Sequence, residues 1–151
     1  ISGIIFDPIK NELFMAEKGN GAYLNNTRTR VSKNKKLKDA MLVTGGPNPS
    51  SKKKNDIYDE FVNLSNSVSI PIRKFGSAAL DLAYVACGRF DGYWQWELNY
   101  WDVAAGILIV KESGGFIHSL KYDDNLPRKR NIIASNSLIH EDLGKLVLKK
   151  Y

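Results

Sequence analysis

The chain has 151 residues, of which 43% are hydrophobic and 25% are charged, as in an ordinary globular domain with a sizeable core. No apolar run is long enough to span a bilayer, and no basic segment precedes an apolar one at the N-terminus, so we expect a cytoplasmic protein with no membrane partner. The single cysteine excludes a disulfide within the chain. This residue, Cys87, is expected to be a small buried side chain rather than a nucleophile.

The formal net charge of +6 is compatible with nucleic-acid binding, but its distribution argues against it. The basic residues gather mostly in predicted turns and at element ends, without the interleaved aromatic side chains of a single-strand binder. We therefore expect solvated loops, and a non-catalytic basic module that binds RNA or protein is the alternative function. The basic clusters are Arg28–Arg30, Lys33–Lys38, Lys52–Lys54 and Arg128–Arg130.

The first 39 residues predict an antiparallel meander. Apolar segments between turn sequences predict strands at residues 1–6, 12–17 and 22–24. Such a meander needs further strands to bury its apolar face and protect its edge. Because the sequence starts directly in an apolar strand, we expect that a preceding segment is missing and that residues 1–39 are strands left from an N-terminal sheet.

Strand and helix patterns alternate from residue 40 onward, which predicts an α/β layer over residues 40–151. Glycine, proline and serine predict a loop at 45–51, the best candidate for a boundary within the chain, and polar residues predict another loop at 121–130. We expect strands at 40–44, 68–73, 91–96, 116–120 and 131–135, and helices at 54–66, 76–88, 102–113 and 140–149.

The helix, strand and helix predicted between residues 73 and 115 organise the chain. Ser77 can cap the first helix through its side-chain oxygen, and Gly88 can end it at positive φ. Asp102 opens the second helix at a strand-to-helix junction, where α/β folds place their chemistry. Its carboxylate could bind Mg²⁺ beside N–H groups that receive a phosphate. The alternative, which the residue type favours by itself, is that Asp102 only caps its helix.

For several other residues, a structural role explains the sequence as well as a functional role does. The small residues at 76–79 allow a ligand to approach backbone N–H groups, although a tight strand-helix junction favours the same composition. His118 and His140 are expected to lie far apart, which makes a zinc site improbable. The aromatic run favours core and interface packing over a stacking platform. Its members are Tyr93, Trp94, Trp96, Tyr100 and Trp101.

Four short segments follow one another in this stretch: Gly76–Leu82, Gly88–Trp94, Trp101–Gly106 and Glu112–Gly115. They resemble the C-terminal signature of the inositol monophosphatase family, in order and at the family's spacing, and residues 4–31 resemble the segment before it. The resemblance covers nearly the whole chain. It implies the C-terminal portion of a layered αβαβα sandwich and a Mg²⁺-dependent phosphatase that hydrolyses a phosphate monoester of inositol or a related polyol.

The resemblance also implies roles for single residues. Asp102 would be a ligand of the catalytic metals. Gln95 falls where many members carry a glutamate that bonds a substrate hydroxyl; glutamine keeps an acceptor, loses the charge and adds a donor, which leaves the exact polyol open. Glu97, two residues on, lies on the same face if the strand persists, and is then a candidate substitute. The implied substrate-binding residues are Gly76, Ser77, Ala78, Ala79 and Gln95.

The family's upstream acidic motifs are absent from this sequence. Asp7-Pro8-Ile9 imitates the opening of one of them, but Lys10 stands where a metal-binding aspartate is needed, so we expect an ordinary hairpin turn. Holding two or more Mg²⁺ ions takes several carboxylates. We therefore expect a fragment that is inactive alone, binds Mg²⁺ fully only with the missing carboxylates, and associates as a dimer through its uncovered face. Fructose 1,6-bisphosphate or a nucleoside bisphosphate is an alternative substrate.

Overall fold

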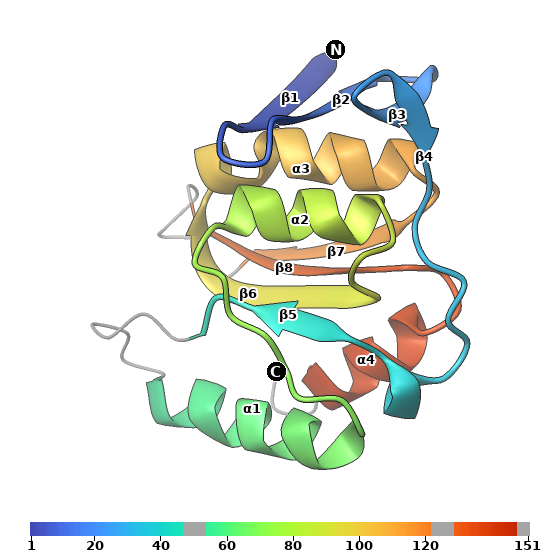
Figure 1. Cartoon of the computed structure of the whole chain (residues 1–151). Coiled ribbons are helices and arrows are strands. Elements are labelled where there is room, and N and C mark those ends of the chain that lie inside the picture. The colour runs from blue at the N-terminus through green and yellow to red at the C-terminus, as the bar shows by residue number, and fades with distance from the viewer. Residues whose placement is uncertain (47–53, 122–128, 148–151) are drawn as a thin grey trace.

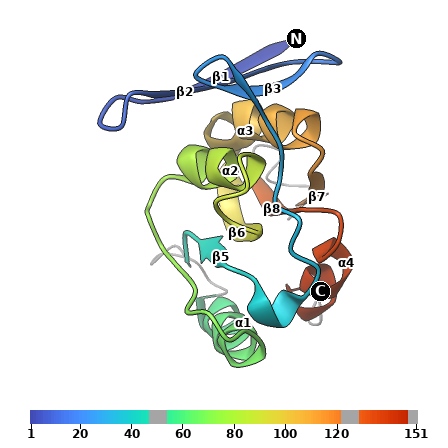
Figure 2. The same ribbon diagram turned by 45° about the vertical axis from the view of Figure 1, so that its right-hand side comes forward.

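A computed structural model of the chain describes residues 1–46, 54–121 and 129–147. It has layers that follow one another down the view of Figure 1: a β-sheet, a pair of helices, a second β-sheet and a second pair of helices. The same order is visible in Figure 2. The upper helices are α2 (Ala78–Ala86) and α3 (Tyr100–Glu112), and the lower ones are α1 (Lys54–Ser67) and α4 (His140–Val147).

The first sheet is the predicted antiparallel meander with one strand more. Its order is β1-β2-β3-β4. The fourth strand was not predicted because it has only three residues, all of them polar; Asn25 and Asn26, at φ 46° and 66°, form the tight turn that returns the chain. The strands are β1 (Ser2–Asp7), β2 (Glu12–Glu17), β3 (Gly21–Leu24) and β4 (Thr27–Thr29).

The first sheet packs one face on α3 and leaves the other uncovered by the described residues. Ile5 is buried, whereas its neighbours Ile4 and Phe6 are 60% and 53% exposed. Gly3 allows the close approach to α3, because a Cβ there would lie 3.1 Å from the carbonyl oxygen of Ala105. The alternation along β1 therefore puts Ile4 and Phe6 on the face opposite the helix layer.

The second sheet has the order β5-β6-β8-β7. Strand β5 runs parallel to β6, and the other pairs are antiparallel. The predicted strand at 68–73 is wrong. Its residues make only an isolated bridge between Arg73 and Val43, because Pro71 in the middle has no N–H for a ladder. The strands are β5 (Leu42–Thr44), β6 (Gly92–Asn99), β7 (Phe116–Lys121) and β8 (Lys129–Ser135).

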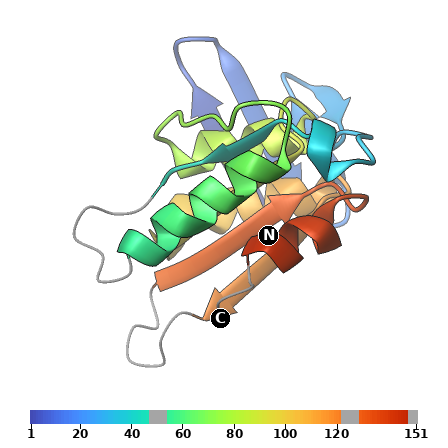
Figure 3. The ribbon, with the colours of Figure 1, turned by 90° about the horizontal axis from the view of Figure 1, so that it is seen from below.

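The helices α1 and α4 lie on the lower face of the second sheet, as Figure 3 shows from below. Ile57 and Leu64 of α1 and Leu143 of α4 are buried there against Trp94 of β6. A single 3₁₀ turn, η1 (Leu37–Asp39), precedes β5. The predicted loops at 45–51 and 121–130 and the end of the last predicted helix fall largely outside the described residues. No described helix is long and apolar enough to cross a membrane.

Between the two sheets, α2 and α3 pack closely on each other. Gly106 of α3 makes this possible, because a Cβ there would lie 2.6 Å from a methyl carbon of Leu82. Ser77 caps α2 as predicted, since its hydroxyl accepts from the Leu80 N–H at 3.3 Å. Gly88 follows α2 at φ 74°, also as predicted. The packing brings the N-terminus of each helix to a fixed place above the second sheet.

Candidate functional site

A cavity of about 440 Å³ lies where α2 and α3 begin, over β6 and the end of β5. Except for the candidate substitute Glu97, the residues that the sequence analysis singled out as substrate-binding or metal-ligating line it: Gly76, Ser77, Ala78, Ala79, Gln95 and Asp102. Gly45, Leu98 and Trp101 complete the lining and were missed. The structure thus brings together residues from four separate places in the chain, while their roles stay predictions.

The start of α2 forms one wall of the cavity. Gly76 has φ 87°, a conformation that other residues rarely adopt. The first N–H groups of a helix have no partner within it. The Leu80 N–H bonds the Ser77 hydroxyl, so the N–H groups of Ala78 and Ala79 are the ones that can receive an anion or a hydroxyl oxygen. The short side chains leave this backbone accessible.

Asp102 forms the second polar wall. Helix α3 starts at Tyr100, two residues earlier than predicted, so Asp102 lies in its first turn rather than at its start. Its Oδ2 accepts from the Asn99 N–H at 3.2 Å, which satisfies one N–H at the helix start. Capping is therefore confirmed. It leaves Oδ1 without a hydrogen bond to the described residues, and the carboxylate also lines the cavity.

Gln95 reaches the cavity from β6. The buried Tyr93 hydroxyl donates to its Oε1 at 2.8 Å. Gly45 leaves room for the amide, because a Cβ there would overlap it. The condition under which Glu97 would share a face with Gln95, a regular strand, is not met: a bulge shifts the register of β6 between Gln95 and Leu98, and Glu97 itself has φ 59°. Glu97 is not among the residues that line the cavity.

The aromatic run divides at the helix start. Tyr93, Trp94 and Trp96 are buried, as predicted for core packing, whereas Tyr100 and Trp101 are 54% and 69% exposed. Trp101 lines the cavity. The aromatic residues of β6 therefore pack in the core, whereas Trp101 of α3 forms part of the cavity wall.

Asp81, on α2, is a buried carboxylate that the sequence analysis passed over. It is fully buried, and neither of its oxygens has a hydrogen-bond partner among the described residues. Burial raises its pKa to about 7. Burial first, then the charges of Asp81 and Asp102, also raise the pKa of Tyr93 well above its ordinary range. Two carboxylates thus lie near the hydroxyl that holds Gln95.

The residues present do not make a magnesium site by themselves. No group of three or more His, Cys, Asp or Glu side chains that could hold a metal occurs in the described ranges. Asp102 is the one carboxylate among the described residues that line the cavity. Mg²⁺ sites usually combine one or two carboxylates with water and substrate oxygens, and catalysis with two ions takes more.

The Asp7 segment is the ordinary hairpin turn that was predicted. Asp7 Oδ1 accepts from the N–H groups of Ile9 and Lys10 at 3.0 and 3.2 Å. Its Oδ2 accepts from the Tyr84 hydroxyl at 3.1 Å. The bond from the Lys10 N–H is the largest cause that lowers the pKa of the Asp7 carboxyl. These bonds occupy the carboxylate in joining β1 to β2 and to α2.

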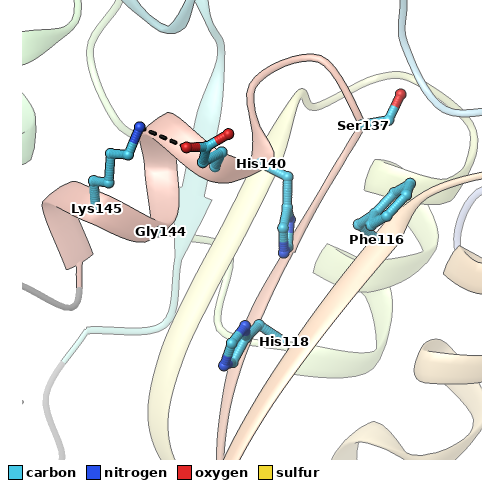
Figure 4. A pocket seen from close by; sticks show the side chains of 7 residues that line it. Phe116, His118, Ser137, His140, Gly144 and Lys145 are labelled. Carbon is cyan, nitrogen blue, oxygen red and sulfur yellow. Dashed lines mark ion pairs between the residues drawn. The ribbon is translucent and has the colours of Figure 1, made fainter.

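A second cavity, of about 530 Å³, lies between β7 and α4. His118 and His140 both line it, so the expectation that they lie far apart is wrong (Figure 4). They meet because β7 pairs with β8, whose end leads into α4. His140 Nδ1 bonds the Ser135 hydroxyl at 2.7 Å. Burial first, then the charge of His118, lower the pKa of His140.

Two β-sheets and two pairs of helices, with a cavity where α2 and α3 begin, define a layered α/β fold. Comparison with known proteins identifies its family. The sequence model of the inositol monophosphatase family matches residues 1–150. The chain belongs to this family.

Its relatives are about twice as long. An inositol-1-monophosphatase of Mesorhizobium japonicum is 38% identical over 149 residues, which are 99% of this chain and 56% of that protein. The Nus factor SuhB of Xylella fastidiosa is 40% identical, over 96% of this chain and 54% of its own. The crystal structure of the extragenic suppressor protein suhB from Bartonella henselae has a TM-score of 0.89 at 44% identity and covers 100% of this chain and 57% of that one. The chain thus spans little more than half of these relatives, as a C-terminal-like portion, and the predicted fold class is confirmed.

Proposed function

We propose that this chain is the C-terminal portion of a Mg²⁺-dependent phosphatase that hydrolyses a phosphate monoester of inositol or a related polyol. The observation that carries the proposal is the single cavity shared by residues 76–79, Gln95 and Asp102. Relatives named inositol-1-monophosphatase support the reaction class.

The chain's own residues have distinct parts in this proposal. The free N–H groups at the start of α2 bind substrate oxygens, and the exposed ring of Trp101 shields the opening. Asp102 supplies one carboxylate oxygen to a metal while its other oxygen keeps the helix start in place. Since one carboxylate is not enough, the remaining metal ligands come from outside this chain. The chain alone is then inactive.

The proposal also covers how the chain is divided, how it associates and in which compartment it acts. Residues 1–39 belong to an N-terminal sheet and residues 40–151 to a C-terminal α/β layer, since the first sheet ends at Thr29 and the second begins at Leu42. The exposed outer face of β1, with Ile4 and Phe6, favours association, including a dimer. The cytoplasm is the compartment that we propose.

Phosphate release from inositol 1-phosphate with Mg²⁺ tests the proposal. The assay compares this chain with the complete protein, in which the residues encoded upstream of Ile1 are restored. Activity in the complete protein and none in the short chain is the expected result. Activity of the short chain, or an inactive but folded complete protein, would contradict the proposal.

The basic interaction module stays a prediction, and two of its key residues, Lys52 and Lys53, lie outside the described residues. A shift of RNA in a native gel that weakens with salt and is lost when Lys52–Lys54 are neutralised would favour it. Substrate profiling of the complete protein separates an inositol phosphatase from an enzyme for fructose 1,6-bisphosphate or a nucleoside bisphosphate.

A further inference from the structure

The cavity between β7 and α4 brings together both histidines of the chain, His118 and His140. Strand alternation puts His118 on the same face of β7 as Phe116, two residues before it. The rings of Phe116 and His140 lie against each other, with 5.7 Å between their centroids. Figure 4 shows both imidazole rings turned toward the same cavity. The two side chains thus reach one space from two separate elements.

Ser135 determines which nitrogen of His140 is left for a ligand. His140 Nδ1 lies 2.7 Å from the Ser135 hydroxyl, and this serine is fully buried on β8. The hydroxyl oxygen can accept from Nδ1–H, and Nε2 then carries the lone pair. Burial first, then the charge of His118, lower the pKa of His140, which favours the neutral ring. Histidines that bind metals usually have their second nitrogen held in this way.

The charged groups around the cavity do not oppose a cation. Glu141 and Lys145 of α4 line it and pair with each other, at 2.7 Å between the Glu141 carboxylate and the Lys145 ammonium. The same ammonium lies 3.9 Å from Asp142. Because two carboxylates compensate the charge of Lys145, a metal ion at the histidines meets no uncompensated positive charge from this lysine.

We propose that His118 and His140 form a binding site for a divalent transition metal ion, which joins β7 to the start of α4. Imidazole nitrogen suits Cu²⁺, Ni²⁺ and Zn²⁺, whereas Mg²⁺ takes oxygen ligands. Cu²⁺ binds most tightly of the three, following the general order of these ions. Water completes the coordination, because two protein ligands are fewer than a closed structural zinc site has.

This metal site is independent of the proposed phosphatase site. The described residues that line the cavity at β7 and α4 are all different from those that line the cavity at Asp102. The two cavities also offer different ligand atoms, since Asp102 presents oxygen and the histidines present nitrogen. Mg²⁺ in excess therefore saturates oxygen sites and leaves the histidine site open to Cu²⁺.

Calorimetric titration of the complete protein with CuCl₂, in the presence of excess MgCl₂, tests the site. His118→Asn and His140→Asn are each expected to lower its Cu²⁺ affinity by about tenfold or more, since losing even a partner that only orients a ligand costs about that much. Electron paramagnetic resonance of the Cu²⁺ complex is expected to show coupling to imidazole nitrogen in the wild type, and to lose the contribution of this site in both variants.

The substitutions are chosen to keep the fold. His118 is exposed, and at position 140 the asparagine amide can still donate to the Ser135 hydroxyl. Glu141→Gln is the matched control, because it removes a charge that lines the same cavity and leaves both imidazoles in place. Its Cu²⁺ affinity is expected to stay close to that of the wild type, since the Glu141 side chain is 83% exposed and its charge is screened.

Two results would overturn the site. One is a folded His118→Asn protein that keeps the Cu²⁺ affinity and the spectrum of the wild type. The other is an affinity that falls as much in Glu141→Gln as in the histidine variants, because charge and not coordination would then hold the ion. If His140→Asn does not fold, His118→Asn decides alone.

Discussion

Asp81→Asn is expected to stabilise the chain, and by more at high pH than at low pH. The wild-type carboxylate is fully buried in α2, and neither oxygen has a hydrogen-bond partner among the described residues. Holding a charge in such a place is unfavourable, so the folded state keeps the proton. Asparagine has nearly the same shape as the protonated acid and is neutral at every pH.

The magnitude follows from the pKa. Burial raises the pKa of Asp81 to about 7 from 3.8, and each unit corresponds to about 1.4 kcal/mol. Because the folded state binds the proton more tightly than the unfolded state, the free energy of unfolding falls as pH rises between these two pKa values and levels off above the higher one. The stability gained by Asp81→Asn is therefore expected to grow by about 2–3 kcal/mol between pH 5 and pH 8.

Urea unfolding of both proteins at pH 5, 6, 7 and 8 measures this difference. Comparing the variant with the wild type at each pH cancels the titration of the histidines and of the other carboxylates. If the difference in free energy of unfolding between Asp81→Asn and the wild type is the same at pH 5 and pH 8, the reasoning is refuted. Protonation of Asp81 would then not be linked to folding.

Three further predictions concern the helix layer and the cavity. Gly106→Ala is expected to lower the free energy of unfolding by about 1–3 kcal/mol through overlap with Leu82, and to cost less in a chain that already carries Leu82→Ala, as a double-mutant cycle by urea unfolding would measure. Ser77→Ala is expected to destabilise by about 1 kcal/mol through loss of the cap, whereas Ser77→Asp, which keeps a capping oxygen, retains most of the stability. Gly45→Ala is expected to displace the Gln95 amide, detectable as a changed side-chain NH₂ signal in a protein of unchanged secondary structure by circular dichroism.

Local sequence patterns predicted most helices and strands, because the residues that start and end these elements lie within a few positions of one another. Ser77 and Gly88 mark the ends of α2 through capping and positive φ, both of which depend on the residue itself. The start of α3 was predicted too late because Asp102 was taken as the first residue of the helix. Its side chain instead accepts from the N–H of Asn99, which precedes the helix, so Asp102 lies inside the first turn. The strand predicted at 68–73 failed because apolar residues suggested a ladder that Pro71 cannot join.

The site was predicted as a set of residues and not as a shape. The family's motifs pointed to Asp102 and Gln95 one by one, and their common cavity depends on how α2 and α3 pack over β6. Spacing could not show the bulge between Gln95 and Leu98, since it depends on pairing with β8. The burial of Asp81 was equally invisible, although an aspartate within the apolar run of α2 was a signal that could have revealed it.

The Mg²⁺ dependence of the complete protein with Asp102→Asn tests the central claim most directly. The amide oxygen of asparagine can still accept from the Asn99 N–H, so the helix start and the thermal stability are expected to be retained. Calorimetric titration with Mg²⁺ is expected to show weaker binding, and phosphate release from inositol 1-phosphate to fall by about a hundredfold or more. Wild-type Mg²⁺ affinity and turnover in this variant would contradict the account.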